Sequence, residues 1–554
     1  MTFLKKLNLT LIATAILLAA VDAWSSGYAV NPMGISYLDM GSAVFHGHLS
    51  AVINGLWSPL YALPLGLAVV LFRPAPVWEF PLLHFVNFLI FLVTVAAFDF
   101  LISEVLRWRN NRSDPTGLPD WAIMSLGYAL FIWCSLGLIT IATTAPDLLL
   151  SAAVYLAFAL LFRIRRGLNG PGTFLFLGLS LGIGYLTKAV MMPLAPFFIL
   201  IGLILACDIR RSFPRLGAAV LGLLLMAGPL IVGLSVTKHR LTIGDSGRLN
   251  YLWHVNKVPF FHWRGDDRFG FMVHPTRMVF ANPAIYEFAS PITATYAPWY
   301  DPSYWYEGPA PRFDLKQQLE VFRTTIRIYL EIFTFTSHLL VIAGFFVLLY
   351  LTRDHSFWSV LREWPLFVLI LICFAIYFPV HIEPRYVAAF IPPLWLILYA
   401  GLRFPSSSPL RKYAAYFVIA VASILILAQA SRSVRAFQAA QVHTGATQLE
   451  VAAKLTNSGL RPGDAVGMIN FNPFWLPIVH WAQLAGVRVV AELPNTETDT
   501  FLRSDESRKQ QVLETFRKTG AKAVIAAEAP EGVSLPGWKH IGNTRYYVLQ
   551  FDQP

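Results

Sequence analysis

The first side chains able to do chemistry follow an N-terminal apolar segment and lie between Gly27 and Tyr61. Asp39 falls in a stretch, Gly34–His46, that we expect to form a short amphipathic helix. The neighbouring polar and aromatic residues are Tyr37, Asn54, Trp57, Ser58 and Tyr61. A carboxylate, an amide and aromatic rings could together bind a sugar and take a proton from a hydroxyl group. An interfacial helix with an aromatic anchor belt is the alternative interpretation.

Further ionisable residues lie at the ends of apolar segments, where charge is costly and therefore suggests function. Asp147 opens one such segment, where it could instead complement a helix dipole. Lys188 ends another and is a candidate phosphate ligand, although it could simply extend to the lipid headgroups. Arg385, beside Glu383 and Tyr386, could bind a phosphate or only form an ion pair with Glu383.

The composition indicates a polytopic membrane protein. Hydrophobic residues make up 56% of the chain and charged residues 14%. The net charge of +11 comes from Lys and Arg at the ends of apolar runs, so it indicates membrane orientation rather than nucleic-acid binding. Three cysteines are too few and too scattered for a disulfide framework or a metal cluster.

Basic flanks and segment lengths predict about eleven α-helical spans. We expect residues 1–24 to be a retained first span, with Lys5 and Lys6 in the cytoplasm. The run Pro59–Phe72 is short, and we expect it to lie along or dip into the outer surface. The other predicted spans are Phe80–Leu106, Trp121–Ile141, Asp147–Phe162, Thr173–Thr187, Ala189–Cys207, Leu216–Val236, His338–Leu351, Pro365–Val380, Tyr386–Leu402 and Tyr413–Ala430. This alternation places the Asp39 loop and both large polar regions on the outer side.

The predicted membrane domain, residues 1–434, carries two outer loops at about residues 27–79 and 237–328. The second loop is rich in aromatic residues: Trp253, Trp263, Trp299, Tyr300, Trp305 and Tyr306, with His254 and His262 among them. Aromatic rings stack on sugars and also anchor loops at membrane interfaces. We expect the interfacial role for most of them.

Residues 435–554 have the composition of a water-soluble domain. Predicted helices and strands alternate there, which favours a small α/β domain. The helices are Thr447–Leu460, Pro477–Ala485 and Ser507–Thr519, and the strands are Ala465–Asn470, Val487–Leu493, Ala521–Ala526 and Tyr546–Phe551. No Gly-rich phosphate loop follows a strand, so we expect a recognition or capping role instead of nucleotide binding.

Several motifs, taken in order, resemble a known family. They are GISYLDMGSA with NGLWSPLY, then TAPDLLL, YLTKA, PWYDPSYW and EPRYVAAFIPPL. The chain resembles the GT-C superfamily of polytopic glycosyltransferases, especially bacterial proteins similar to dolichyl-phosphate-mannose mannosyltransferases. Aminoarabinose transferases and protein O-mannosyltransferases are more distant. One departure is Met33-Gly34, where members of the superfamily often carry an acid before the loop tyrosine.

The resemblance implies an enzyme of the bacterial inner membrane, with the C-terminal domain outside. It would transfer a hexosyl or pentosyl group from a polyprenyl-phosphate donor to a lipid, glycan or protein acceptor. Asp39 is the candidate base and Asp147 the second candidate, while Lys188 and Arg385 would bind the donor phosphate. The substrate-binding candidates are Tyr37, Asn54, Trp57, Tyr61, Glu383 and Tyr386.

No cofactor is expected. A divalent cation held by Asp39 and Asp147 is not favoured, because no acid pair at ligand spacing is visible. Two other functions fit a polytopic protein: a transporter or flippase of lipid-linked sugars, and a non-catalytic assembly protein of the cell envelope. A transporter would be expected to show repeated halves with broken spans, and the Gly34–Tyr61 pattern has no second copy.

Overall fold

The computed structural model describes residues 3–111, 116–207, 212–288, 294–405, 409–442, 446–473, 477–533 and 535–551. The chain forms two compact units. The helical unit comprises residues 1–26, 84–250 and 313–441, and the sheet unit comprises residues 27–83, 251–312 and 442–554. The predicted division near residue 435 into two folding domains stays a prediction.

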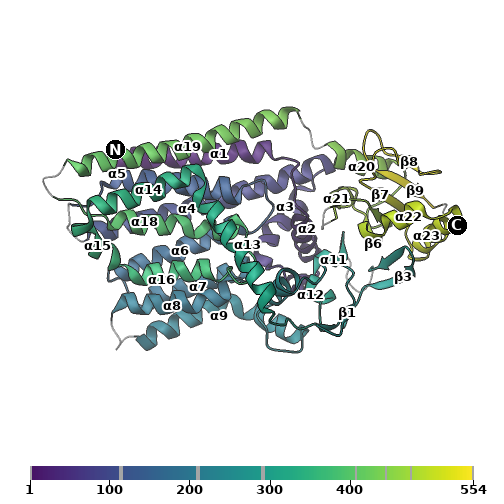
Figure 1. The fold of residues 1–554 in the computed structure, drawn as a ribbon, viewed down its shortest axis with the longest axis horizontal. Coiled ribbons are helices and arrows are strands. Elements are labelled where there is room, and N and C mark those ends of the chain that lie inside the picture. Colours follow the sequence, from purple (N-terminus) through teal and green to yellow (C-terminus); the bar gives the residue numbers. More distant parts are fainter. Residues whose placement is uncertain are drawn as a thin grey trace. The chain divides into compact units, whose positions relative to one another are not determined.

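The helical unit is built from apolar helices, several of which run side by side (Figure 1). They are α1 (Phe3–Ser25), α4 (Pro76–Asn110), α5 (Asp120–Ile132), the π-helical η3 (Trp133–Ile139), α6 (Asp147–Arg165), α7 (Pro171–Thr187), α8 (Met191–Ala206), α9 (Ser212–Thr237), α10 (Ser246–Asn250), α13 (Leu315–Thr334), α14 (Thr336–Leu351), α15 (Arg353–Leu361), α16 (Trp364–Ala375), α17 (Pro384–Val387), η6 (Ala388–Phe390), α18 (Ile391–Gly401) and α19 (Leu410–Val442). The first turns of α4, up to Leu83, belong to the sheet unit.

Each predicted span coincides with one or more of these helices. Within the described ranges, six helices are long and apolar enough to cross a membrane, or up to eight if two bent helix pairs each count as one span. The helices α7 and α8 and the segment Pro59–Phe72 are apolar but shorter. The protein is therefore a multi-pass α-helical membrane protein, as predicted.

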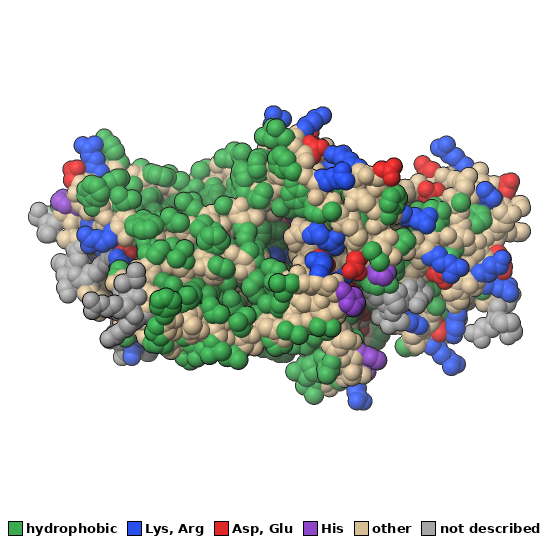
Figure 2. Space-filling model, turned by 90° about the horizontal axis from the view of Figure 1, so that it is seen from below, with side chains coloured by type: hydrophobic (Ala, Val, Ile, Leu, Met, Phe, Trp, Pro, Cys, Tyr) green, Lys and Arg blue, Asp and Glu red, His purple; other side chains and the backbone are tan. Residues whose placement is uncertain are grey.

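The exposed surface of the helices in the helical unit is apolar, as a surface in contact with lipid should be. Phe213, Leu221 and Leu225 of α9 and Phe346 and Tyr350 of α14 are all more than half exposed. Figure 2 shows a broad, continuous area of hydrophobic side chains over the helices.

Helices α7 and α9 approach closely because glycines face the partner backbone. A Cβ atom at Gly178 would overlap the carbonyl oxygen of Ala219, and one at Gly222 would overlap that of Leu175. Small residues at such crossings let helix backbones pack directly in a membrane. This contact fixes α7, whose last residue immediately precedes Lys188.

We expect Gly178→Ala to lower the stability of the protein by about 1–3 kcal/mol, because the added methyl group must push α7 away from α9. Gly172→Ala is the matched control on the same helix, since a Cβ atom there meets nothing within 4 Å. Thermal unfolding in detergent, followed by circular dichroism, measures the difference. Equal melting temperatures for the two variants would contradict the inferred close contact.

The sheet unit contains a seven-stranded sheet in the order β3-β4-β6-β5-β7-β9-β8. Its strands are β3 (Arg277–Ala281), β4 (Ala284–Glu287), β5 (Ala465–Asn470), β6 (Arg488–Leu493), β7 (Ala523–Ala527), β8 (Lys539–His540) and β9 (Tyr547–Gln550). The central strand β5 is parallel to both β6 and β7, and its last five residues are buried. Two short strands, β1 (Gly265–Asp266) and β2 (Gly270–Phe271), form a separate sheet.

The predicted C-terminal strands correspond to β5, β6, β7 and β9, with small differences at their ends. The predicted helices correspond to α20 (Ala446–Asn457), α21 (His480–Ala485) and α23 (Glu506–Lys518), and two short helices, η7 (Asn495–Glu497) and α22 (Thr498–Arg503), follow β6. The hairpin β3–β4 was not expected, because it comes from the long loop and joins the sheet through pairing of β4 with β6.

The N-terminal part of the sheet unit is helical. The expected Asp39 helix is α2 (Pro32–Phe45), which packs on α3 (Ala62–Phe72) after the short η1 (Leu49–Val52) and η2 (Pro59–Tyr61). Gly41 and Gly66 bring α2 and α3 together, because a Cβ atom on either would overlap the other helix's backbone. The remaining loop helices are η5 (Tyr251–Val255), α11 (Ala297–Tyr300) and α12 (Pro302–Trp305).

Candidate active site

In the helical unit, two cations meet at one buried carboxylate. Asp147 is the first residue of α6 and is 1% exposed. Its Oδ1 atom lies 2.7 Å from Lys188 Nζ, and its Oδ2 atom lies 3.4 Å from Arg385 Nη1. Lys188 follows the last residue of α7, and Arg385 lies in α17. The positive end of the α6 dipole adds to the stabilisation of this carboxylate.

Side chains of α4 hold the loop that leads into Asp147. His84 Nδ1 lies 3.2 Å from the carbonyl oxygen of Ile141, and Asn87 Nδ2 donates to the same oxygen at 3.1 Å. Ile141 follows the π-helical turn η3, a local irregularity that often accompanies a functional site. The loop into α6 is thus fixed by buried polar contacts.

Glu383 and Tyr386 complete this group, which we call the Asp147 cluster (Asp147, Lys188, Glu383, Arg385 and Tyr386). Glu383 Oε2 accepts a hydrogen bond from Arg385 Nε at 2.6 Å, and its Oε1 accepts one from Tyr386 Oη at 3.1 Å. Lys188 Nζ lies 3.7 Å from the centre of the Tyr386 ring, a cation–π contact. The positive charges of Lys188 and Arg385 are thus balanced by the carboxylates of Asp147 and Glu383.

Glu383 is the exposed member of the cluster, with 39% of its side chain accessible, against 8% for Arg385. Burial alone would raise the pKa of the Glu383 carboxyl group. Hydrogen bonds from His381 and Arg385, together with the positive charge of Arg385, outweigh burial and hold that pKa well below its usual range. Glu383 is therefore a carboxylate at neutral pH.

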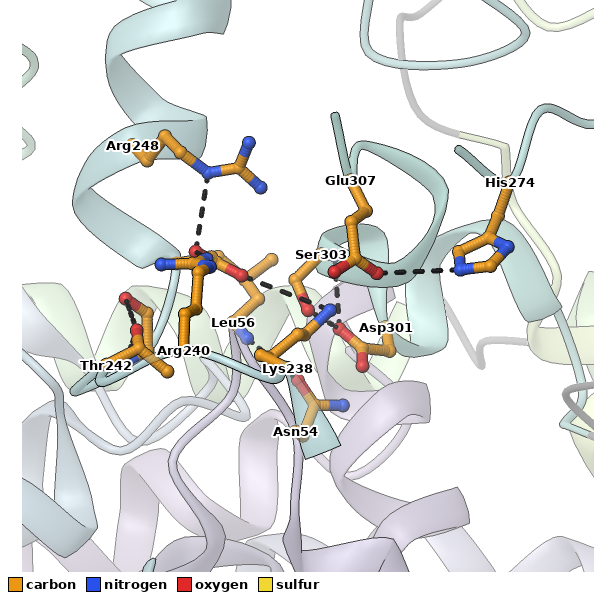
Figure 3. Close-up of polar contacts among 12 residues, drawn as sticks. Asn54, Leu56, Lys238, Arg240, Thr242, Arg248, His274, Asp301, Ser303 and Glu307 are labelled. Atoms are coloured by element: carbon orange, nitrogen blue, oxygen red, sulfur yellow. Dashed lines mark hydrogen bonds and ion pairs between the residues drawn. The ribbon is translucent and has the colours of Figure 1, made fainter. Parts of the chain in front are cut away.

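A second carboxylate of the helical unit is surrounded by cations that the sequence analysis did not single out. Asp245 is 2% exposed and interacts with Arg240, Arg248 at 3.3 Å and Lys238 at 4.0 Å; Figure 3 labels these three cations. Its loop is tied to α7, because Tyr185 Oη donates to the carbonyl oxygen of Ile243. The run of basic residues that follows α9 was the sequence signal from which this charged group could have been predicted.

In the sheet unit, the candidate base Asp39 is half-buried on α2. Its Oδ2 atom accepts the backbone N–H of Thr295, and its Oδ1 atom lies 2.9 Å from Thr295 Oγ1. Burial is the largest influence on Asp39 and raises the pKa of its carboxyl group to about 7. The hydrogen bonds from Thr295 act in the opposite direction, and the charge of Glu79 raises the pKa further. A carboxyl group with a pKa near neutrality suits a general base.

The aromatic residues near Asp39 pack against one another. The Tyr37 ring lies 5.0 Å from Tyr61 and 5.6 Å from Trp57, measured between ring centroids. Tyr37 and Tyr61 are buried, and Trp57 is the partly exposed ring of the three. Trp57 Nε1 donates to the carbonyl oxygen of Trp299 at 3.0 Å, which attaches α11 to this group.

Asn54 organises the turn before Trp57. Its Oδ1 atom accepts the backbone N–H groups of Leu56 and Trp57, and its Nδ2 atom donates to the carbonyl oxygen of Tyr300 at 2.7 Å. Figure 3 labels Asn54 and Leu56 in this turn. The buried amide of Asn54 therefore holds the first loop against the second. This is a structural role, and the predicted contact with substrate would be additional to it.

The PWYDPSYW segment is internally braced. Asp301 Oδ1 accepts both the backbone N–H and the hydroxyl group of Ser303, which caps α12. In the same close-up, Glu307 faces His274, whose Nε2 atom lies 3.5 Å from Glu307 Oε2 (Figure 3). The motif quoted for the family resemblance thus forms a compact corner of the sheet unit.

The interfacial role expected for most aromatic residues of the second loop is wrong for four of them. Trp253, Trp299, Trp305 and Tyr306 are each no more than 6% exposed. They lie inside the sheet unit, where Trp253 packs against both Trp299 and Tyr306. Burying these rings together excludes water from the loop's own core, so they cannot anchor it to lipid.

The structure thus brings the sequence-predicted residues together in two groups. One is the Asp147 cluster in the helical unit, and the other is Tyr37, Asp39, Asn54, Trp57 and Tyr61 in the sheet unit. Their roles, and their assignment to one active site, stay predictions. Sequence reasoning missed Thr295 and His381; the HIEPRY string was a signal for His381, whereas Thr295 had none.

Among the residues that the structure describes, no group of three or more His, Cys, Asp or Glu side chains could hold a metal ion. The preference for a mechanism without a divalent cation remains an expectation.

Comparison with known proteins gives a fold. No family model and no curated protein matches the sequence. ArnT from Cupriavidus metallidurans bound to undecaprenyl phosphate is 11% identical, with a TM-score of 0.56 over 98% of this chain and 97% of that chain. Its apo state is 11% identical, with a TM-score of 0.53 over 99% and 98%. The oligosaccharyltransferase AglB from Archaeoglobus fulgidus, in complex with dolichol-phosphate and an inhibitory peptide, is 12% identical, with a TM-score of 0.48 over 95% and 70%. The likeness to ArnT over almost the whole of both chains shows that this chain, with its apolar helices and its small sheet, has the same fold.

Proposed function

We propose that this protein transfers a sugar from a polyprenyl-phosphate donor to a hydroxyl-bearing lipid, glycan or protein acceptor. The observation that carries the proposal is the likeness, over almost the whole of both chains, to ArnT bound to undecaprenyl phosphate. A hexosyl or pentosyl group is the expected cargo, as the resemblance of the sequence motifs to the GT-C superfamily implies.

Asp39 is the proposed general base. The acceptor O–H bond breaks and its proton passes to the Asp39 carboxylate, while the acceptor oxygen bonds to the anomeric carbon. The bond between that carbon and the phosphate oxygen breaks, and its electron pair leaves with the lipid phosphate. Asp147 is a weaker candidate, because both of its oxygens already face cations. Trp57, partly exposed, would stack on the sugar.

The Asp147 cluster is the proposed phosphate site. Arg385 and Lys188 offer a planar fork and a point charge, which together suit phosphate oxygens. Glu383 lies against Arg385 at the position where we expect a phosphate to bind. As the exposed carboxylate of the group, Glu383 would move aside when the donor binds, while Asp147 keeps both cations in position.

We also propose that the sheet unit lies on the outer side of a bacterial inner membrane. The Asp39 loop, the aromatic loop and the C-terminal segment all belong to that unit, which supports one common side for them. The basic residues flanking the spans support the exterior as this common side. Reporter fusions near His48 and after Ala430 should both report the outer side; opposite results would shift the alternation by one span.

The direct test uses the purified full-length protein in lipid vesicles with a panel of hexosyl and pentosyl polyprenyl phosphates. Release of polyprenyl phosphate is measured, because this product forms whatever the acceptor is. We expect release that requires an added acceptor extract and is absent in Asp39→Asn. Movement of intact donor across the bilayer without cleavage would overturn the proposal in favour of a flippase. Absence of both cleavage and movement across the whole panel would favour the non-catalytic assembly role.

A further inference from the structure

A continuous chain of polar contacts in the sheet unit links Asp39 to a second carboxylate. Thr295 Oγ1 lies 2.9 Å from Asp39 Oδ1 and 2.7 Å from Gln483 Oε1. Gln483 Nε2 then donates to Glu79 Oε1 at 2.9 Å. Thr295 comes from the long loop, Gln483 from α21 in the C-terminal segment, and Glu79 from the first turn of α4. Three distant parts of the sequence therefore meet at the candidate base.

The hydroxyl group of Thr295 has one proton but two neighbouring acceptors. Glu79 fixes the amide of Gln483, because the Nε2 end must point to the Glu79 carboxylate and leaves Oε1 toward Thr295. When Asp39 is ionised, the Thr295 hydroxyl donates either to Asp39 or to Gln483, and the other acceptor receives no hydrogen bond from it. When Asp39 is protonated, its own O–H group donates to Thr295, and Thr295 donates to Gln483. Every member is then satisfied.

Among the residues that the structure describes, few other titratable groups lie on the elements around Asp39. The titratable side chains on the elements that pack against α2 are Tyr61 on η2, Arg73 at the end of α3, Tyr300 on α11 and His480 on α21; η1 carries none. Arg73 is exposed at the C-terminal end of α3. Glu79 is the carboxylate whose charge acts on Asp39. Thr295 and Gln483 therefore form a polar path between the C-terminal segment and the candidate base.

We propose that Thr295 and Gln483 are positioning residues that hold Asp39 and accommodate both of its protonation states. This inference rests on the proposed role of Asp39 as the base. When the acceptor proton arrives on Asp39, the Thr295 hydroxyl turns from Asp39 to Gln483, and the new Asp39 O–H turns to Thr295. No further proton is transferred, and the backbone N–H of Thr295 continues to donate to Oδ2.

The two residues act in opposite directions on Asp39. Thr295→Val removes a donor to the carboxylate and also the acceptor for the protonated acid. The first loss is the larger, because hydrogen bonds to charged groups are stronger than neutral ones, so Asp39 should ionise at a higher pH. Gln483→Met removes the competing acceptor, which leaves the Thr295 proton to Asp39 alone, so Asp39 should ionise at a lower pH. Each shift should be about one pH unit, the effect of one hydrogen bond to a charged group. Thr295→Ser keeps the hydroxyl and should restore the native value.

The test records two quantities on full-length protein in lipid vesicles. One is the pH dependence of sugar transfer, whose acidic limb should move up in Thr295→Val and down in Gln483→Met. The other needs no activity: an infrared titration of the protonated carboxyl band of Asp39, identified by subtracting Asp39→Asn. Opposite infrared shifts, with rescue by Thr295→Ser, support the inference. Shifts in the same direction, or none, overturn it. Opposite infrared shifts without any transferase activity would leave the network in place and count against the proposed function instead.

Discussion

Asp39→Asn should reduce sugar transfer by about 10²–10⁴-fold while leaving the protein folded, because the amide has the same size but cannot accept the acceptor's proton. Transfer by the native protein should rise with pH through about 7, where Asp39 ionises. Since the carboxylate is the active form, a more acidic solution removes the base. Initial rates measured across pH with one lipid donor test both statements.

The same substitution makes a second, independent prediction about stability. A carboxyl group whose pKa is raised on folding stabilises the folded state below its ordinary pKa, and this contribution is lost as the pH rises through the folded pKa. At pH 8, Asp39→Asn should therefore unfold at the same temperature as the native protein or higher. Lost activity accompanied by a lower melting temperature would point to a structural role for Asp39. Full activity in Asp39→Asn with loss in Asp147→Asn would transfer the role of base to Asp147.

Arg385→Lys should reduce transfer by about 10²-fold, although it keeps the charge. Arg385 contacts Asp147 through Nη1 and Glu383 through Nε, and the single ammonium group of a lysine cannot reproduce this fork. Lys188→Ala should weaken use of the lipid donor, seen as a higher KM. Rates measured over a range of donor concentrations separate the two effects.

Arg327→Lys is the matched control for Arg385→Lys. Arg327 forms an exposed ion pair with Glu331 on α13, with 81% of its side chain accessible, and surface pairs of this kind contribute little. Its replacement should leave transfer and melting temperature unchanged. If Arg385→Lys behaves like Arg327→Lys at every donor concentration, the phosphate role of the cluster is wrong.

Much of the fold could be predicted from local features. Apolar runs ending in basic residues located the spans, and short apolar runs between predicted helices located β5, β6, β7 and β9. The hairpin β3–β4 could not be predicted in the same way, because a strand at the end of a sheet depends on a partner elsewhere. The pairing of Tyr286 with Glu492 joins parts of the sequence that carry no local sign of each other.

The candidate site was predicted in part for the same reason. Sequence reasoning expected Lys188 and Arg385 to share an anionic ligand, and the anion that they share in the structure is Asp147. The contact between Asp39 and Thr295 spans 256 residues, and threonine in a loop has no distinguishing pattern. Local chemistry identified the charged groups, while long-range packing decided which of them meet.

The hairpin β3–β4 also has a consequence for how the protein is made. A ribosome produces the hairpin well before β6, the strand with which β4 pairs, and Glu492 of β6 follows its bonding partner Tyr296 by 196 residues. In the interval the edge of β4 has no neighbour, and an unpaired edge of this kind invites pairing with other chains. Further membrane helices must be inserted in the same interval. Biogenesis of this protein should therefore depend on protection of the aromatic loop by a chaperone until synthesis reaches β6.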